Sequence, residues 1–97
     1  MSTLHVLSHS PFGDSRFASC LRIFGEHDAL LLCGDATYAL RPGTAPFETL
    51  LGRGLKLFVL AEDVQARALQ APDWAKAIDY PAFVELSIEH DKVNTWL

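Results

Sequence analysis

The sequence has few cysteines, no long apolar run and no recognisable leader. Cys20 and Cys33 are the only two cysteines among 97 residues, too few for the disulfide framework of a small secreted domain. No segment approaches the ~20 consecutive apolar residues that a membrane-spanning helix needs. The opening MSTLHVLSHS lacks the basic start and apolar core of a signal peptide. We therefore expect a cytoplasmic chain with reduced thiols and no contact with a membrane.

Clustered positive charge is also missing. The net charge is −4, and the eight basic residues are spread along the chain with no two adjacent. They are Arg16, Arg22, Arg41, Arg53, Lys56, Arg67, Lys76 and Lys92. Binding to nucleic acid needs a basic face that neutralises several phosphates at once. We therefore expect no direct contact with nucleic acid.

Motifs that bind nucleotides or carry a nucleophilic serine are absent. The sequence contains no GxGxxG, no P-loop and no GxSxG. Its one close pair of glycines, in Gly52-Arg53-Gly54, predicts the end of a helix before the next strand. We expect the chain to bind no cofactor.

The residue types that bind zinc are present, but their spacing is wrong for a metal site. His5, His9, Cys20 and Cys33 supply four potential ligands. If His5 and His9 lie along one extended segment, their Cα atoms are roughly 13 Å apart at ~3.3 Å per residue, too far to share one ion easily. No CxxC or helical HxxxH spacing supports a site. We therefore expect no bound metal.

Apolar residues are abundant for a chain of this length. We expect one domain over residues 1–97, and a chain this short buries only ~60–65% of the surface that its unfolded form exposes. Yet 49% of the residues are hydrophobic and the mean hydropathy is +0.15. Part of this apolar surface should lie between subunits. The composition therefore predicts an obligate oligomer.

Apolar runs typical of strands alternate with helical patterns along the chain. This alternation predicts an α/β fold with a mostly parallel sheet of four or five strands flanked by helices. The segment Ala36–Leu40 fits either a short helix or a strand. The expected strands are Thr3–Leu7, Ala29–Cys33, Lys56–Leu60, Ala77–Asp79 and Val93–Leu97, and the expected helices are Ser15–Glu26, Phe47–Leu51, Ala61–Leu69 and Tyr80–Glu89.

Cys20 is the first candidate for chemistry. In the predicted first helix, Phe17, Leu21 and Phe24 share one face. At 100° per residue, Cys20 lies about 60° from Phe17, at the margin of that face. A residue there is partly buried and can face a cleft or a partner. Cys20 is therefore either a small apolar side chain in the core or an interface, or a nucleophile that handles sulfur.

A nucleophilic Cys20 would need a lowered thiol pKa. Arg16 lies four residues earlier and would favour the thiolate. Asp14 is placed to accept a hydrogen bond from the first turn of the helix. With Asp14 as the cap, Cys20 is the sixth residue of the helix, beyond the first turn where the helix dipole acts. These features leave the packing role favoured and the chemical role open.

Other polar residues follow the predicted strands. Cys33 ends the most apolar strand, where it either fills the core or lies at the carboxyl edge of the sheet, the usual place for sites in α/β proteins. Asp35 and Tyr38 follow it closely. Glu62 and Asp63 follow the next strand, where they either begin a solvated helix or belong to a site. None of these residues forms a known motif.

Five segments of the chain together have a familiar order. They are LHVLSHSPF, FASCLRIF, ALLLCGDATYAL, KLFVLAEDVQARAL and DYPAFVELSIEHDKVNTWL, and they cover nearly the whole length. On these segments the chain resembles the TusB/DsrH family of small sulfur-relay subunits. No single segment is a catalytic signature, so the resemblance rests on their order and on the chain length.

The resemblance implies a DsrE-like α/β fold and a heterohexamer of three related subunits in two copies each. In the TusBCD branch, with TusC-like and TusD-like partners, persulfide sulfur passes to a TusE-like acceptor for 2-thiolation of the tRNA wobble uridine. In the DsrEFH branch, with DsrE-like and DsrF-like partners, the complex serves dissimilatory sulfur oxidation. The main sulfur-bearing cysteine is expected in the TusD/DsrE-type subunit, which makes this chain an accessory or non-catalytic one.

The resemblance also bears on Cys20. Some members, notably on the DsrH side, carry a cysteine in an S-C-L context in the first helix, which Ser19-Cys20-Leu21 matches. Cys20 is thus a candidate accessory persulfide site. The turn LLLCGDA departs from the LLLxxDG of TusB-like sequences, which leaves the role of Asp35 open.

A remaining alternative, which does not depend on the resemblance, is that the chain is a dimeric module that binds a small anion near Ser10–Ser15.

Overall fold

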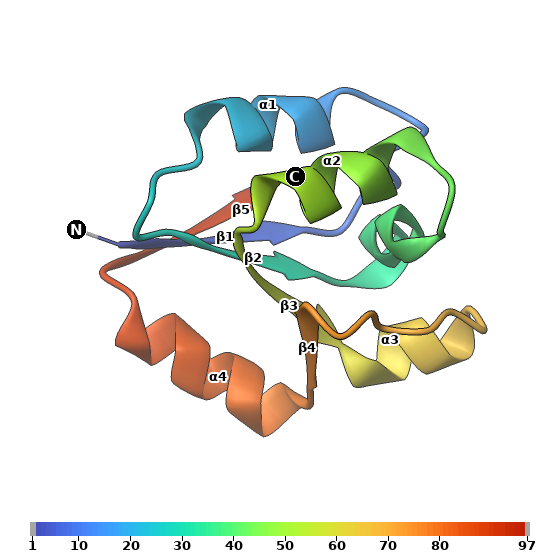
Figure 1. Cartoon of the computed structure of the whole chain (residues 1–97). Coiled ribbons are helices and arrows are strands. Elements are labelled where there is room, and N and C mark those ends of the chain that lie inside the picture. The colour runs from blue at the N-terminus through green and yellow to red at the C-terminus, as the bar shows by residue number, and fades with distance from the viewer. Residues whose placement is uncertain (1, 97) are drawn as a thin grey trace.

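A computed structural model describes residues 2–96 as one five-stranded parallel sheet with helices on both faces (Figure 1). The predicted α/β fold with a mostly parallel sheet of four or five strands is confirmed. The strands are β1 Thr3–Leu7, β2 Ala29–Leu32, β3 Lys56–Leu60, β4 Ala75–Ile78 and β5 Lys92–Trp96. The helices are α1 Arg16–Ile23, the 3-10 helix η1 Gly34–Leu40, α2 Ala45–Arg53, α3 Ala61–Ala66 and α4 Tyr80–Glu89.

The order of the strands explains why both faces are covered. The sheet runs β4-β3-β2-β1-β5, so the chain adds β2, β3 and β4 in turn on one side of β1. The connection through α4 then returns across the sheet and places β5 on the other side of β1. Helices α1 and α2 lie on one face, and α4 lies on the opposite face (Figure 1). Helix α3 directly follows β3.

Two apolar clusters fill the space between the sheet and its helices. On the α1–α2 face, Leu30 and Leu32 of β2 pack in one cluster with Phe17 and Leu50. On the α4 face, Leu31 belongs to the other cluster, together with Leu4, Val6 and Leu86. Successive side chains of a strand point to opposite faces, so every residue of β2 is buried. This double burial is the reason for the continuous apolar run ALLL.

Several predicted boundaries need correction. Helix α1 ends at Ile23, three residues before the predicted Glu26. The segment Ala36–Leu40, whose sequence fits either a short helix or a strand, is part of the 3-10 helix η1. Helix α2 is longer than predicted because Pro46 fits its first turn, and it ends where Gly54 adopts the left-handed conformation with φ 60°. Gly52 therefore lies inside the helix, and Gly54 alone provides the predicted stop.

The C-terminal half needs similar corrections. Helix α3 ends at Ala66, before the predicted Leu69, and the chain then turns through Ala68 with φ 53°. Strand β4 begins at Ala75 because its backbone pairs with β3 from Leu57 onward. Strand β5 begins at Lys92, one residue before the predicted Val93, and lies at one edge of the sheet. Leu97, the last residue of the predicted final strand, lies outside the described residues.

None of the helices between residues 2 and 96 is both long enough and apolar enough to cross a bilayer.

Candidate functional site

Cys20 lies in the interior of the molecule and not at its margin. Its exposed fraction is 0%, and it belongs to the cluster that contains Phe17 of α1, Leu50 of α2 and Leu30 of the sheet. The expectation that Cys20 is only partly buried is therefore wrong for the isolated chain. The helical pattern of α1 identifies only the side of the helix that packs on the sheet. In the structure α2 lies beside α1 on the same face of the sheet (Figure 1), so a residue at the margin of that side is covered as well.

The surroundings of Cys20 oppose the formation of a thiolate. Burial is the main cause that raises the pKa of the thiol, to about 12, and the negative charge of Asp28 adds to it. The positive charge of Arg53 lowers the pKa only in part. A thiol with this pKa is protonated at neutral pH, so Cys20 in the isolated chain is neither accessible nor activated.

Cys33 lies where sites of α/β proteins usually occur, at the carboxyl edge of the sheet. It follows β2 directly and is half-buried. Its amide donates to the carbonyl of Leu7 at 3.0 Å, and its Sγ lies 3.5 Å from the same oxygen. Burial raises the pKa of this thiol as well, Asp63 raises it further, and Arg67 opposes both. Cys33 is therefore more accessible than Cys20, but it is not activated either.

Asp35 and Tyr38, which follow β2, and Asp63, which follows β3, come together beside Cys33. The Gly34 amide donates to Asp63 Oδ2 at 2.7 Å, and Arg67 Nη2 donates to Asp35 Oδ1 at 2.9 Å. The Arg67 guanidinium also lies 5.8 Å from the centre of the Tyr38 ring. Arg67 was not among the predicted candidates. Its place four residues after Asp63 on the same helical segment was the only signal that pointed to it. Glu62 is exposed.

At Gly34, two segments of the chain approach each other closely at the carboxyl edge of the sheet. Its φ is 52°, and a Cβ atom at this position would lie 3.2 Å from the carbonyl oxygen of Ser8. Glycine is the residue that best combines this conformation with so close an approach of two chain segments. The hydrogen bonds of Cys33 and Gly34 join the start of η1 to the end of β1 and to α3. They form a structural network, in which each polar partner is already satisfied.

The histidines do not join the cysteines. His5 is buried, and its Nε2 lies 3.0 Å from Asp28 Oδ2, while the Trp96 indole N–H donates to its Nδ1 at 3.2 Å. Because Nδ1 accepts, the proton of a neutral ring lies on Nε2, which donates to Asp28. His9 is exposed. Over residues 2–96, no three His, Cys, Asp or Glu side chains gather in a way that would hold a metal ion.

The start of α1 already has a negative group. Asp14 Oδ1 accepts from the Arg16 amide at 2.9 Å, as its predicted capping role requires, and the Asp14 carboxylate also pairs with the Arg16 guanidinium. Ser15 is the N-cap residue and makes no side-chain capping bond. The amide at the start of the helix therefore has a partner within the chain, which weakens the alternative of an anion site near Ser10–Ser15.

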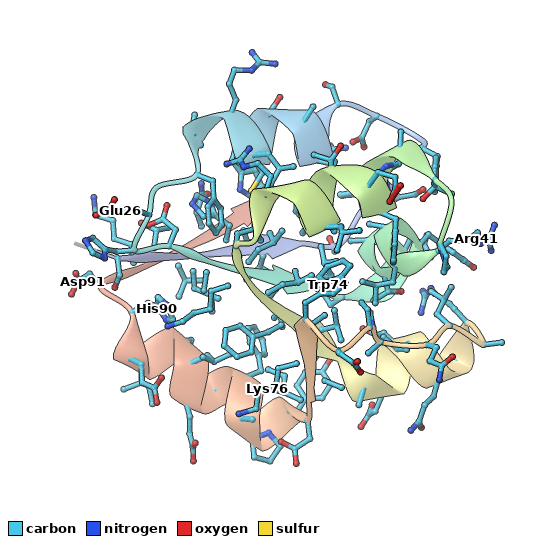
Figure 2. All side chains as sticks on the ribbon, in the orientation of Figure 1. Glu26, Arg41, Trp74, Lys76, His90 and Asp91 are labelled. Atoms are coloured by element: carbon cyan, nitrogen blue, oxygen red, sulfur yellow. The ribbon has the colours of Figure 1, made fainter. Side chains whose placement is uncertain are left out.

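One hollow on the surface is lined by neither cysteine. It has a volume of about 800 Å³, and Arg41, Phe47, Arg67 and Trp74 are among its lining residues. The Trp74 ring packs edge-on against Phe47, with ring centres 5.4 Å apart. Figure 2 shows Arg41 and Trp74 on the α2–α3 side of the molecule. Because neither thiol lines this hollow, it provides no obvious site for sulfur chemistry.

Comparison with known proteins gives the family. A family model described as DsrH like protein matches residues 9–93. The chain is 35% identical over 95 residues to Protein TusB of Erwinia tasmaniensis. The alignment covers 96% of this chain and 99% of that protein. It is 37% identical, with the same two shares, to Protein TusB of Escherichia coli O139:H28.

A solved structure supports the same fold. This chain superposes on the crystal structure of the ychN protein from E. coli with a TM-score of 0.72. The match covers 99% of this chain and 100% of that one at 16% sequence identity, so it bears on the fold alone. The family model and the relatives, which align over 96% of this chain, lead to one conclusion. This chain belongs to the DsrH/TusB family of sulfur-relay subunits.

Proposed function

We propose that this single-domain chain is an accessory subunit of a cytoplasmic TusBCD-type sulfur-relay complex. The observation that carries the proposal is the similarity to proteins named TusB over 96% of the chain. In the complex, a TusD-like subunit holds the main persulfide cysteine and a TusC-like subunit completes a heterohexamer. Sulfur then passes to a TusE-like acceptor on the way to 2-thiolation of the tRNA wobble uridine.

The distribution of apolar side chains supports a role in assembly. Large apolar residues are exposed on both sides of the sheet, including Ile88 at 77% and Phe12 at 56%. On α4, Tyr80, Val84 and Ile88 form an exposed stripe at spacings of four residues. Contiguous apolar surface on a small chain usually marks a contact with another protein. The stripe fits an interface that brings this chain against a sulfur-carrying neighbour.

Deleting the gene for this chain is expected to abolish 2-thiouridine at the wobble position, because the relay complex would lose one of its subunits. The measurement is mass spectrometry of nucleosides from digested tRNA in the deletion strain and its parent. A plasmid that carries the unchanged gene is the control and should restore the modification. Normal thiolation in the deletion strain would contradict the proposal.

The second candidate is a DsrH-type subunit of a DsrEFH complex in sulfur oxidation, with Cys20 as an accessory persulfide site. The match to the DsrH family model favours it. In this reaction the Cys20 thiolate would attack the terminal sulfur of a donor persulfide. The donor S–S bond breaks, the donor leaves as a thiolate, and Cys20 carries the persulfide.

Replacing Cys20 by alanine separates the two candidates. In the assembled complex, Cys20→Ala is expected to leave the rate of sulfur transfer unchanged, because a buried thiol with a pKa of about 12 is a poor nucleophile. Intact-mass analysis of the sulfur-loaded complex should find no added sulfur on this chain. Loss of transfer in Cys20→Ala, together with an added sulfur atom on Cys20 in the unchanged chain, would favour the second candidate.

A further inference from the structure

A groove with an apolar end and a basic end runs between α1 and α2. It has a volume of about 560 Å³. Its lining includes Ala18 of α1 and Ala45 and Thr49 of α2. These small side chains leave room between the two helices, so another chain segment could approach their backbones closely. The groove is therefore shaped to receive an elongated partner.

The two ends of the groove differ in chemistry. Pro11, Phe12 and Pro46 lie near the start of both helices, and the Phe12 side chain is largely exposed. Arg22 in the last turn of α1 and Arg53 in the last turn of α2 lie at the other end. Helices α1 and α2 run in the same direction (Figure 1), so the last turns that hold the two arginines lie at the same end of the groove.

The two arginines lack partners in a chain that is acidic overall. The net charge is −4, yet no carboxylate lines the groove. Among the hydrogen bonds and ion pairs of residues 2–96, none involves the Arg22 or Arg53 side chain. Two exposed cations beside an apolar surface favour an anionic partner, since charge complementarity selects and orients protein contacts.

We propose that the α1–α2 groove binds an amphipathic helix of another subunit. The apolar face of that helix lies along Phe12, Ala18 and Thr49, and carboxylates at one of its ends pair with Arg22 and Arg53. The inference rests on the proposed function in one respect, because it takes the partner to be a different subunit of the relay complex. A symmetric contact between two copies of the groove is disfavoured because no carboxylate lines it, so neither copy would supply an acidic partner for the arginines of the other.

The first test uses charge reversal in the assembled complex. The chain is co-expressed with the related subunits, the complex is purified through a tag on another subunit, and the amount of this chain recovered is measured. The double variant Arg22→Glu, Arg53→Glu is expected to lower recovery by about tenfold or more, because repulsion replaces attraction at a desolvated contact. The matched control reverses two exposed cations outside the groove, Arg41→Glu and Lys92→Glu, and should leave recovery unchanged.

The second test identifies the occupant. A photo-crosslinking amino acid at Thr49 should link to a peptide of another subunit that has apolar residues at helical spacing and Asp or Glu at one end. Changing those acidic residues to lysine should restore recovery of the Arg22→Glu, Arg53→Glu variant. Thermal unfolding of both double variants checks that the exposed substitutions leave the fold intact.

The outcomes separate this inference from the proposed function. If the unchanged chain assembles and the Arg22→Glu, Arg53→Glu variant assembles equally well, the groove is not the contact and only this inference fails. A crosslink to a second copy of this chain, or to a peptide without carboxylates, overturns it as well. If the unchanged chain assembles with no related subunit, the proposed function and this inference fail together.

Discussion

Cys20 in the folded, isolated chain is expected to react with iodoacetamide about a thousandfold more slowly than in the unfolded chain. Alkylation requires the thiolate, and the pKa of Cys20 rises from 9.0 to about 12 on folding. Near pH 8 this shift lowers the thiolate fraction by about three orders of magnitude, and burial at 0% exposure slows access of the reagent further. Timed labelling, quenching and peptide mass spectrometry measure the rate at each cysteine.

Cys33 is the internal control for this measurement. It is half-buried, so it should be labelled before Cys20 in the folded chain, and both should react at similar rates in denaturant. Labelling of Cys20 at its unfolded rate would show that the thiol opens readily to solvent. Repeating the experiment on the assembled complex shows whether the partners change its accessibility, which a persulfide-carrying role would require.

Asp28→Ala is expected to lower the free energy of unfolding by about 3 kcal/mol, because it removes the acceptor shared by three donors, one of which is the buried His5 ring. The Asp28 carboxylate accepts from the Thr3 amide at 3.0 Å, from His5 Nε2 at 3.0 Å and from the Gly25 amide at 2.9 Å. Each donor left without a partner costs about 1–3 kcal/mol when water cannot replace the carboxylate. Urea denaturation near 25 °C measures the change.

Two variants serve as controls for Asp28→Ala. Asp28→Asn keeps one acceptor oxygen and should lose less stability. Asp73→Ala removes an exposed carboxylate and should change the free energy of unfolding by no more than about 0.5 kcal/mol. If Asp28→Ala were as stable as Asp73→Ala, the hydrogen bonds around Asp28 would contribute little to the fold.

The same carboxylate predicts a dependence on pH. Burial raises the pKa of Asp28, but hydrogen bonds from Gly25, His5 and Thr3 outweigh it and hold the pKa below the usual value of 3.8. A lowered folded-state pKa means that the contribution of Asp28 to stability is complete above the unfolded pKa. It is lost as the pH falls through the lower folded pKa. Asp28→Asn should therefore show a smaller loss of stability in acid than the unchanged chain.

Much of the architecture follows from local patterns in the sequence. The runs ALLL and KLFVL predict strands that are buried on both faces, and the structure places them as β2 and β3 near the centre of the sheet. The glycine at 54 predicts the end of a helix, and Asp14 predicts a bond to the first turn of α1. These features depend on residues within a few positions of one another, so sequence spacing alone reveals them.

The surroundings of the candidate residues depend instead on how the chain returns on itself. The Gly34–Asp63 bond joins residues 29 positions apart, and the Trp96–His5 bond joins residues 91 positions apart. The helical pattern predicts Cys20 at the margin of an apolar face, but α2 and the sheet bury it completely. The residues around Cys20 carry no information on where α2 packs, because α2 begins about 25 residues later in the chain.

The sequence by itself determined the class of fold, the absence of nucleotide-binding and nucleophile motifs, and the resemblance to the DsrH/TusB family, because each of these depends on residue order and local periodicity. The tertiary structure alone decided that Cys20 is an inaccessible, protonated thiol, and that Arg22 and Arg53 line one end of the same groove. Burial, pKa and unpaired charge depend on which distant segments surround a side chain. Those neighbours exist only once the sheet has formed and both of its faces are covered.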